Sequence, residues 1–135
     1  RYPEVDEYME RTVEFARANG HVRTMLGRRR PVTDLTSNNF NQRQGARRVA
    51  INTPVQGSAA DIIKLAMLAV DAALTEQFPT VRMLLQVHDE LVFEVPEELV
   101  DRVAALVVDK MENACELAVP LKVDWGVGRN WDEAH

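Results

Sequence analysis

One long apolar segment constrains the fold more than any other feature. Between residues 62 and 74, apolar side chains occupy almost every helical position and leave no polar face. A helix that is apolar on all sides is stable only where other elements cover it. We therefore predict a central, buried helix that ends at Gln77-Phe78-Pro79. Its apolar residues are Ile62, Ile63, Leu65, Ala66, Met67, Ala69, Val70, Ala73 and Leu74.

Helix-end signals organise the N-terminal half. Thr53-Pro54-Val55-Gln56 has the form of a capping box with Pro at the first helical position, which predicts that the buried helix begins there. A separate helix is predicted from about Gln42 to Ile51. Helical spacing predicts another over residues 3–19, and Asn19-Gly20 is typical of its C-terminal end.

The segment between these helices is expected to be extended and then irregular. Short extended pieces are predicted around His21–Met25 and Arg29–Thr33, with a turn at Leu26-Gly27. The stretch Thr33–Asn41 is rich in Asp, Ser, Thr and Asn, which is typical of a loop.

The C-terminal half carries strand signals. Two β-prone runs, Met83–Val87 and Leu91–Val95, flank the polar tripeptide His88-Asp89-Glu90 and predict a hairpin. Pro96-Glu97-Glu98 then opens a helix, and Leu121–Trp125 alternates as a half-buried strand does. The fold class is therefore α+β: a small antiparallel sheet, formed by the hairpin plus the C-terminal strand, backed by helices.

Charge is distributed unevenly along the chain. The net charge of −5 argues against a nucleic-acid partner, but residues 1–64 carry 11 Lys and Arg against 7 Asp and Glu, whereas residues 65–135 carry 5 against 14. Arginine suits bidentate contacts with phosphates and base edges. The pattern fits a chain that holds a polyanion in one place and a cation in another, and a solvated basic face explains it as well. The arginines between residues 21 and 48 are Arg23, Arg28, Arg29, Arg30, Arg43, Arg47 and Arg48.

Cysteine content and hydropathy bear on location. Cys115 is the only cysteine, which excludes an intramolecular disulfide and favours a reducing, cytoplasmic compartment. No apolar run approaches the ~20 residues that span a bilayer, so no membrane partner is expected. The chain does not begin with Met, which predicts that an upstream segment belongs to it.

The hairpin tip is the strongest candidate for chemistry. Asp89 and Glu90 are adjacent carboxylates held by stiff apolar strands, and such hard oxygen ligands suit Mg²⁺. A metal ion there would activate a hydroxyl nucleophile and stabilise a transferring phosphoryl group. Turn formation alone also explains the tripeptide, because Asp is common in turns. A two-metal centre needs a further carboxylate, for which Asp61 and Asp124 are possible but unsupported by any other feature of the sequence.

A second candidate lies where the two N-terminal helices are predicted to meet. Arg48, Asn52 and Gln56 are spaced four apart, so they share one face if the backbone stays helical through Pro54. Arg, Asn and Gln are side chains that hydrogen-bond base edges and sugars. Alternatively, Gln56 only completes the capping box with Thr53 and Arg48 is solvated.

Several blocks in this chain occur in the order found in a known family. They are Gly27-Arg28-Arg29-Arg30, Arg48 to Asp61, Gln86 to Glu94, Val119-Pro120-Leu121, and Gly126-Val127-Gly128 before Trp131. Together they resemble the C-terminal end of the family A DNA polymerases, the bacterial members in particular. The block Gln-Val-His-Asp-Glu-Leu-Val is similar to the family's third polymerase motif, and Asn-x-Pro-x-Gln-Gly is an independent match.

The resemblance implies a role for each residue of the tip. Asp89 would be a ligand of the catalytic Mg²⁺ ions, of which two are expected, and Mn²⁺ would be able to substitute. Glu90 would support the catalytic site beside it. His88 would lie near the primer terminus and contact DNA.

The resemblance also implies contacts with primer–template DNA. Arg48, Asn52 and Gln56 would contact it near the nascent base pair from the minor groove, where every correct pair offers similar acceptors. Arg28 and Arg29 would contact the template backbone.

The implied activity is that of a DNA-directed DNA polymerase. It is Mg²⁺-dependent nucleotidyl transfer from a dNTP to a primer 3′-hydroxyl, in DNA replication and repair. Residues 1–50 would form the fingers base and basic DNA-contact region, and residues 51–135 a portion of the palm.

Parts of the family's pattern are missing from this sequence. The upstream Asp motif and the fingers helix that grips the dNTP are absent, so the remainder of a polymerase chain is an expected partner and the isolated chain is expected to be inactive. Two alternatives remain: a non-catalytic nucleic-acid-binding module, and a metal-dependent phosphodiesterase or nuclease centred on Asp89 and Glu90.

Overall fold

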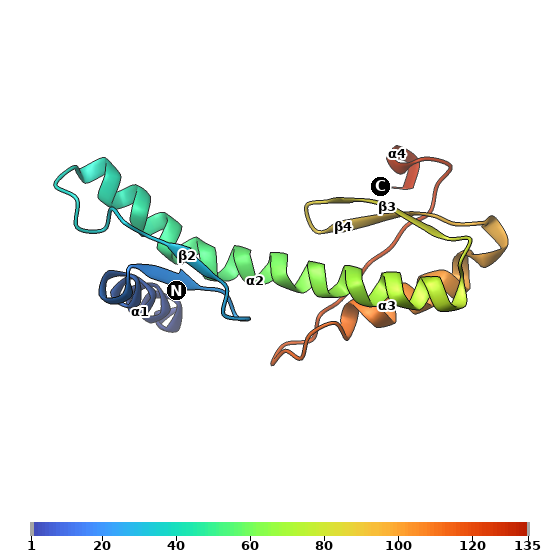
Figure 1. Cartoon of the computed structure of the whole chain (residues 1–135), viewed down its shortest axis with the longest axis horizontal. Helices are drawn as coiled ribbons and strands as arrows, with labels where there is room; N and C mark the ends of the chain where they lie inside the picture. Colours follow the sequence, from blue (N-terminus) through green and yellow to red (C-terminus); the bar gives the residue numbers. More distant parts are fainter. Residues whose placement is uncertain (1, 135) are drawn as a thin grey trace. The chain divides into compact units, whose positions relative to one another are not determined.

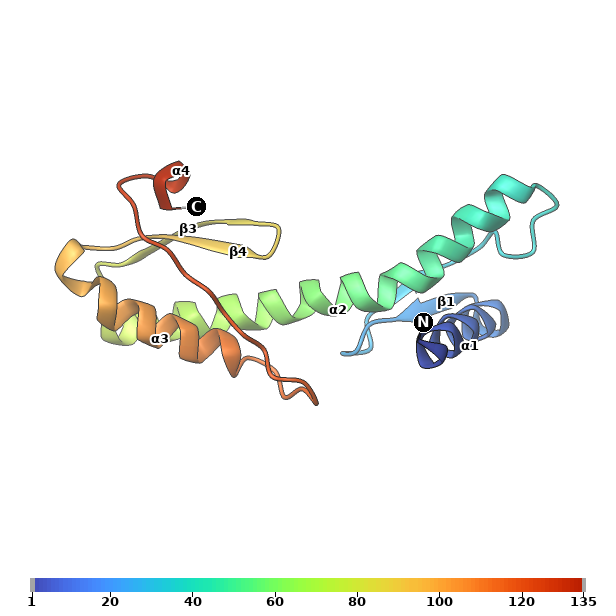
Figure 2. The same ribbon diagram turned by 180° about the vertical axis from the view of Figure 1, so that it is seen from behind.

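The computed structural model of the chain describes residues 2–134, and its helices and strands form two compact units. The first unit ends at Asp61 and the second begins at Ile62, inside the helix α2 (Phe40–Gln77) (Figures 1 and 2). The mixture of helices with two antiparallel two-stranded sheets confirms the α+β class. Within residues 2–134, no helix has the length and apolarity needed to cross a membrane.

The first unit packs two helices around a small hairpin. Helix α1 (Pro3–Asn19) has the predicted bounds and ends at Gly20, whose φ of 75° is left-handed and whose N–H donates to the Ala16 carbonyl at 2.8 Å. Strands β1 (His21–Arg23) and β2 (Arg29–Pro31) pair antiparallel, as the two predicted extended pieces require. The core of this unit consists of Val13, Ala16, Val22, Val32, Leu35, Ala46 and Ala50.

Helix α2 corrects the prediction of two helices. It is continuous from Phe40 to Gln77 with Pro54 inside it, so Thr53 is not a helix cap. Its N-terminus is capped instead by Asn39, whose Oδ1 accepts from the backbone N–H groups of Asn41 and Gln42 at 2.9 and 3.3 Å.

Tertiary contacts offset the helix-breaking effect of Pro54. An internal proline costs about 3 kcal/mol in an isolated helix, because the ring removes a hydrogen bond and crowds the preceding turn. Here Ala50 and Thr53 are buried just before Pro54, and the Ser58 hydroxyl donates to the Pro54 carbonyl just after it. Burial before the proline and a side-chain hydrogen bond after it therefore help to keep the backbone helical.

The second unit combines a hairpin with helices. Strands β3 (Arg82–Val87) and β4 (Glu90–Glu94) pair antiparallel, with a register shift between Met83 and Leu85. A short 3₁₀ turn (Glu97–Leu99) leads into α3 (Val100–Glu112), as the acids after Pro96 predicted. The core residues Val70, Leu74, Val81, Val103 and Val107 join α2, α3 and the segment before β3.

The central helix is less enclosed than its sequence predicted. Ala66, Val70, Ala73 and Leu74 form one buried side, but Leu68 is 69% exposed. Within residues 2–134 the segment 62–74 therefore has a single buried stripe, and its apolar residues on other faces are half-buried or, like Leu68 and Ala72, exposed.

The predicted strand Leu121–Trp125 does not form. Neither β3 nor β4 pairs with this segment, and its Val123 N–H donates instead to Glu112 Oε2 at 2.9 Å. Alternating polarity shows which face of a strand could be buried, but a strand also needs an open strand edge beside it.

The chain after this segment folds back at two glycines. A Cβ on Gly126 would lie 2.5 Å from the Ala134 carbonyl oxygen, and one on Gly128 would lie 2.5 Å from the Ala134 nitrogen. The short helix α4 (Trp131–Ala134) therefore approaches the backbone more closely than any side chain would allow.

Candidate metal-binding carboxylates and nucleic-acid interface

The tip of the β3–β4 hairpin is tighter than predicted. Val87 pairs with Glu90, so the turn consists of His88 and Asp89 alone and Glu90 is the first residue of β4. His88 has a φ of 54°, the left-handed region that few non-glycine residues adopt. The Gln86 side-chain amide donates to the His88 carbonyl at 2.6 Å, which holds the turn in this conformation.

The two carboxylates of the tip differ in exposure. Asp89 is exposed, whereas Glu90 is half-buried at the start of its strand. Among residues 2–134, no three His, Cys, Asp or Glu side chains lie close enough to hold a metal ion together. Mg²⁺ in phosphoryl-transfer sites is commonly bound by one or two carboxylates together with waters and substrate phosphates. The tip therefore offers carboxylates of the kind that such a site uses, whereas a two-metal centre would need at least one further carboxylate from elsewhere in the polypeptide.

Helix α2 presents the second candidate group on one exposed face. Because the helix continues through Pro54, Arg48, Asn52 and Gln56 follow one another at successive four-residue steps, and all three side chains are exposed. A stripe of one cation and two amides offers several hydrogen-bond donors in a row and also two acceptors. The prediction that these residues share one face required a helical backbone through Pro54, and the structure has one.

Arg28 and Asp61 form the most buried ionic contact of the first unit. Asp61 is 8% exposed and accepts from Arg28 Nε at 2.8 Å and from the Thr24 hydroxyl at 2.6 Å. An Arg28 terminal nitrogen also donates to the Gly57 carbonyl at 3.3 Å. The Asp61 carboxylate is thus committed to an ion pair, which removes the reason to consider it as a metal ligand.

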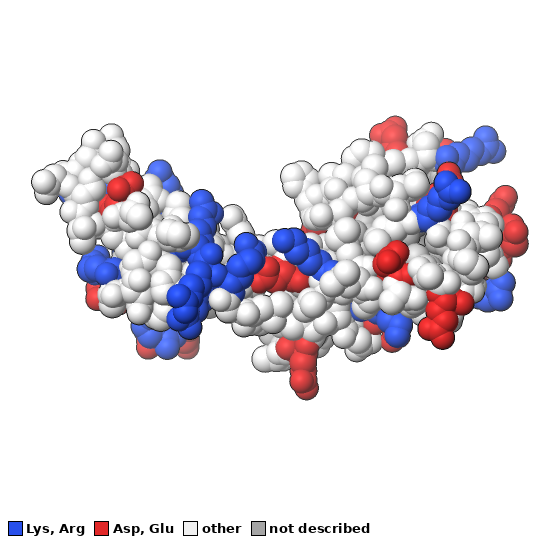
Figure 3. Space-filling model, viewed as in Figure 1, with Lys and Arg blue, Asp and Glu red and all other residues white. Residues whose placement is uncertain are grey.

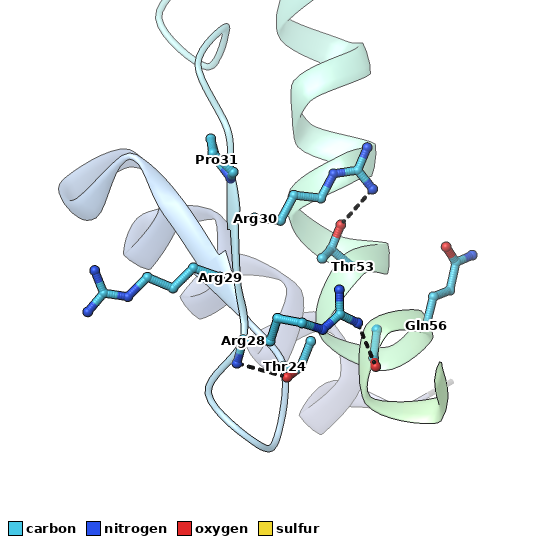
Figure 4. Close-up of a pocket in the computed structure, with 8 residues that line it drawn as sticks. Thr24, Arg28, Arg29, Arg30, Pro31, Thr53 and Gln56 are labelled. Carbon is cyan, nitrogen blue, oxygen red and sulfur yellow. Dashed lines mark hydrogen bonds between the residues drawn. The ribbon is translucent and has the colours of Figure 1, made fainter. Parts of the chain in front are cut away.

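A pocket of about 330 Å³ lies between β2 and α2 in this unit. Arg28, Arg29, Arg30 and Gln56 line it together with Thr24, Pro31, Thr53 and Gly57. Figure 4 shows the guanidinium groups of Arg28 and Arg30 directed toward α2, whereas that of Arg29 points away from them. Three of the predicted DNA contacts, Arg28, Arg29 and Gln56, therefore line one basic pocket.

The other arginines of the cluster have different surroundings. Arg47 donates to Glu10 on α1 at 2.6 Å, Arg43 donates to the Ser37 carbonyl at 2.8 Å, and Arg23 stacks on Phe15. Arg29 and Arg48 make no such contact within the described part of the chain. Figure 3 shows the basic side chains gathered over the first unit beside β2 and α2.

The predicted DNA contacts did not include Thr24, Thr53 or Asp61, and Arg30 was predicted only as a member of the basic cluster. Asp61 carried a usable signal, because it is the only acid between residues 49 and 70 in an otherwise apolar helical segment. A buried carboxylate is rarely found without a cation or several donors. The signal did not identify the partner, which lies in the turn between β1 and β2.

The similarity of this chain to known proteins extends over almost its whole length. The model of DNA polymerase family A matches residues 1–133. DNA polymerase I of Lactococcus lactis subsp. cremoris (strain MG1363) is 53% identical over 134 residues, which are 99% of this chain and 15% of that protein. DNA polymerase I of Bacillus subtilis (strain 168) is 52% identical over 130 residues, 96% of this chain and 15% of that protein.

A solved structure agrees with this comparison. The POL domain of Pol1 from M. smegmatis, in complex with DNA primer-template and dNTP, has a TM-score of 0.91 and 49% sequence identity, over 96% of this chain and 23% of that one. The chain spans about 15% of the length of the curated relatives it matches. The resemblance read from the motifs is confirmed, and the chain belongs to DNA polymerase family A.

Proposed function

We propose that the complete polypeptide carrying this chain is a DNA-directed DNA polymerase that transfers a nucleotidyl group from a dNTP to a primer 3′-hydroxyl. The observation that carries the proposal is the tight hairpin tip, which presents the exposed Asp89 carboxylate beside Glu90 in a chain of this family. Residues 1–50 serve as the fingers base and DNA-contact region, and residues 51–135 as a palm portion. The protein acts in the cytoplasm, where Cys115 stays reduced.

Asp89 supplies one carboxylate to a Mg²⁺ site, which Mn²⁺ can also occupy. Two such ions, when bound, stabilise the attacking and leaving oxygens of the transferring phosphoryl group. The two-residue turn restricts the Asp89 backbone, which favours placement of its carboxylate before substrate arrives. Glu90 lies one residue further, on the first paired position of β4, and adds negative charge that favours cation binding.

The first unit contributes the contacts to primer–template DNA. Arg48, Asn52 and Gln56 offer donors on one exposed face of α2, which suits the acceptors that every correct base pair presents in the minor groove. Arg28 and Arg29 contact the phosphate backbone. His88 at the hairpin tip contacts the DNA near the primer terminus.

Asp89→Asn in the complete polypeptide tests the proposal. The substitution keeps the shape of the side chain and removes the charge that binds the metal ion. We expect primer extension to slow on the order of 10³-fold, because several kcal/mol of charge stabilisation are lost, while the Kd for primer–template stays within about threefold.

Asp71→Asn is the matched control, because Asp71 is an exposed acid on α2 in the same unit as the tip. Unchanged extension by the Asp89 variant would overturn the metal role of the tip. Mg²⁺-dependent cleavage of DNA without extension, lost in the same variant, would instead identify a nuclease. Salt-sensitive DNA binding with neither activity would identify a binding module.

A further inference from the structure

The buried carboxylate of Asp61 has a role that neither the metal site nor the base-contact stripe requires. It lies on α2 at 8% exposure and accepts from two side chains of a different element, Thr24 and Arg28. Burying a carboxylate is unfavourable unless a cation and further donors compensate it. The pair therefore indicates that Asp61 holds the β1–β2 turn in a defined place on the helix.

Further contacts hold the same turn. The Arg28 backbone N–H donates to the Thr24 hydroxyl oxygen at 3.1 Å, and the Met25 N–H donates to the Ser58 hydroxyl oxygen at 2.7 Å. A Cβ on Gly57 would lie 2.6 Å from Thr24 Cγ2, so the turn touches the helix backbone itself. The position of Arg28 is thus determined from its backbone as well as from its guanidinium.

The guanidinium keeps donors that these contacts do not use. Its Nε–H goes to Asp61 and one Nη2–H goes to the Gly57 carbonyl. A guanidinium has five N–H donors in a fixed planar fork, so the Nη1 end remains for a ligand. The Arg28 side chain is 54% exposed and lines the basic pocket together with Arg30 and Gln56 (Figure 4).

We propose that Asp61 is a positioning residue for DNA binding: it orients Arg28 so that the free end of the guanidinium meets a backbone phosphate of the bound strand in the pocket beside Gln56. This inference rests on the proposed function. A fork fixed in advance gives a stronger and more specific phosphate contact than a mobile one, because less side-chain freedom is lost on binding.

The direction in which Asp61→Asn changes the affinity for DNA distinguishes a positioning role from a purely electrostatic one. Asp61→Asn removes a negative charge near the DNA, so electrostatics alone predicts tighter binding. Positioning predicts weaker binding, by about tenfold, because the phosphate contact loses its fixed donor. The charge-matched control is Glu10→Gln, which removes the acid paired with Arg47 at 2.6 Å in the same unit, outside the pocket.

The experiment measures the Kd for primer–template in the complete polypeptide by fluorescence anisotropy, with Tm recorded for each variant. The set is Asp61→Asn, Arg28→Ala and the double variant, which leaves no unpaired buried charge. We expect each single variant to bind about tenfold more weakly and the double variant to bind no more weakly than Arg28→Ala, because Asp61 acts through Arg28. Glu10→Gln is expected to bind as tightly as the parent, or more tightly.

Two results would overturn the inference: tighter binding by Asp61→Asn, or effects of the two substitutions that multiply in the double variant. If Asp61→Asn lowers Tm and the losses of affinity multiply in the double variant, Asp61 has a structural role only. Arg48→Ala separates this inference from the proposed function. If Arg48→Ala weakens binding and Asp61→Asn does not, only the positioning role fails, whereas an unmodified polypeptide that does not bind primer–template contradicts the proposed function itself.

Discussion

At the scale of single residues, Gly57 decides how closely the basic turn approaches α2. A Cβ there would lie 2.6 Å from Thr24 Cγ2, and Thr24 cannot turn away easily because its hydroxyl is held by Asp61 at 2.6 Å. Overpacking of this kind costs about 1–3 kcal/mol. We expect Gly57→Ala to lower the free energy of unfolding by an amount in this range, measured by urea denaturation of the complete polypeptide.

Gly45→Ala is the control for that substitution. Gly45 lies in the same helix, and nothing lies within 4 Å of a Cβ added to it. Alanine should therefore stabilise the helix by roughly 0.5–1 kcal/mol through its higher propensity. Stabilisation by both substitutions would show that the turn is not held against the helix at Gly57.

The arginines also differ from one another, because some are paired with an acid and others are not. Arg48 is exposed on α2, whereas the neighbouring Arg47 is paired with Glu10. A free cation that neutralises DNA charge, either at a phosphate or in the negative potential of the minor groove, displaces counterions and contributes about 0.9 to the slope of log K against log salt. We expect Arg48→Ala to lower this slope by about one for primer–template binding and Arg47→Ala to leave it nearly unchanged. Equal changes in slope would contradict the assignment of Arg48 as a direct contact.

Residue spacing predicted the geometry of one part of the candidate site. Arg48, Asn52 and Gln56 could be placed on one face from their spacing, because helical periodicity is a local property. The Arg28–Asp61 pair could not be predicted in the same way, because its partners are 33 residues apart and meet only through the packing of the turn on α2. Spacing in the sequence carries no information about such a contact.

At the scale of elements, local signals succeeded where the element is held by its own neighbours in sequence. Helix α1 and the β3–β4 hairpin have their ends set by Gly20 and by a short turn, and both were predicted. The capping signal at Thr53 failed because packing across Pro54 overrode it. The Leu121–Trp125 strand failed because pairing depends on a second strand, which polarity does not specify.

The two glycines near the C-terminus support an element-scale prediction. A Cβ on Gly128 would lie 2.5 Å from the Ala134 nitrogen and 2.7 Å from the Glu133 carbonyl carbon, both backbone atoms that cannot rotate away. We expect Gly128→Ala to displace α4 and to raise hydrogen exchange across residues 126–134, while exchange in α3 stays unchanged. Unaltered exchange in residues 126–134 would show that α4 does not rest on this glycine. Gly45→Ala again serves as the control.

At the scale of the whole molecule, charge and chemistry divide between the two units. The first unit carries the basic pocket and the α2 stripe, and the second carries the hairpin carboxylates. The hydrophobic clusters divide in the same way, since one is drawn from residues 13–50 and the other from residues 70–107. Each group of candidate site residues is therefore supported by a core within its own unit.

The incomplete set of metal ligands leads to the prediction that the 135 residues alone do not extend a primer. A two-metal centre needs a carboxylate beyond the adjacent pair at the tip, and residues 2–134 bring no third acidic, His or Cys side chain into a common site. We expect no extension product from the purified chain in Mg²⁺ or Mn²⁺ over a time in which the complete polypeptide extends every primer. Circular dichroism on the same sample shows whether the chain is folded. Extension by a folded sample, lost in Asp89→Asn, would mean that these residues complete the metal site without the rest of the polypeptide.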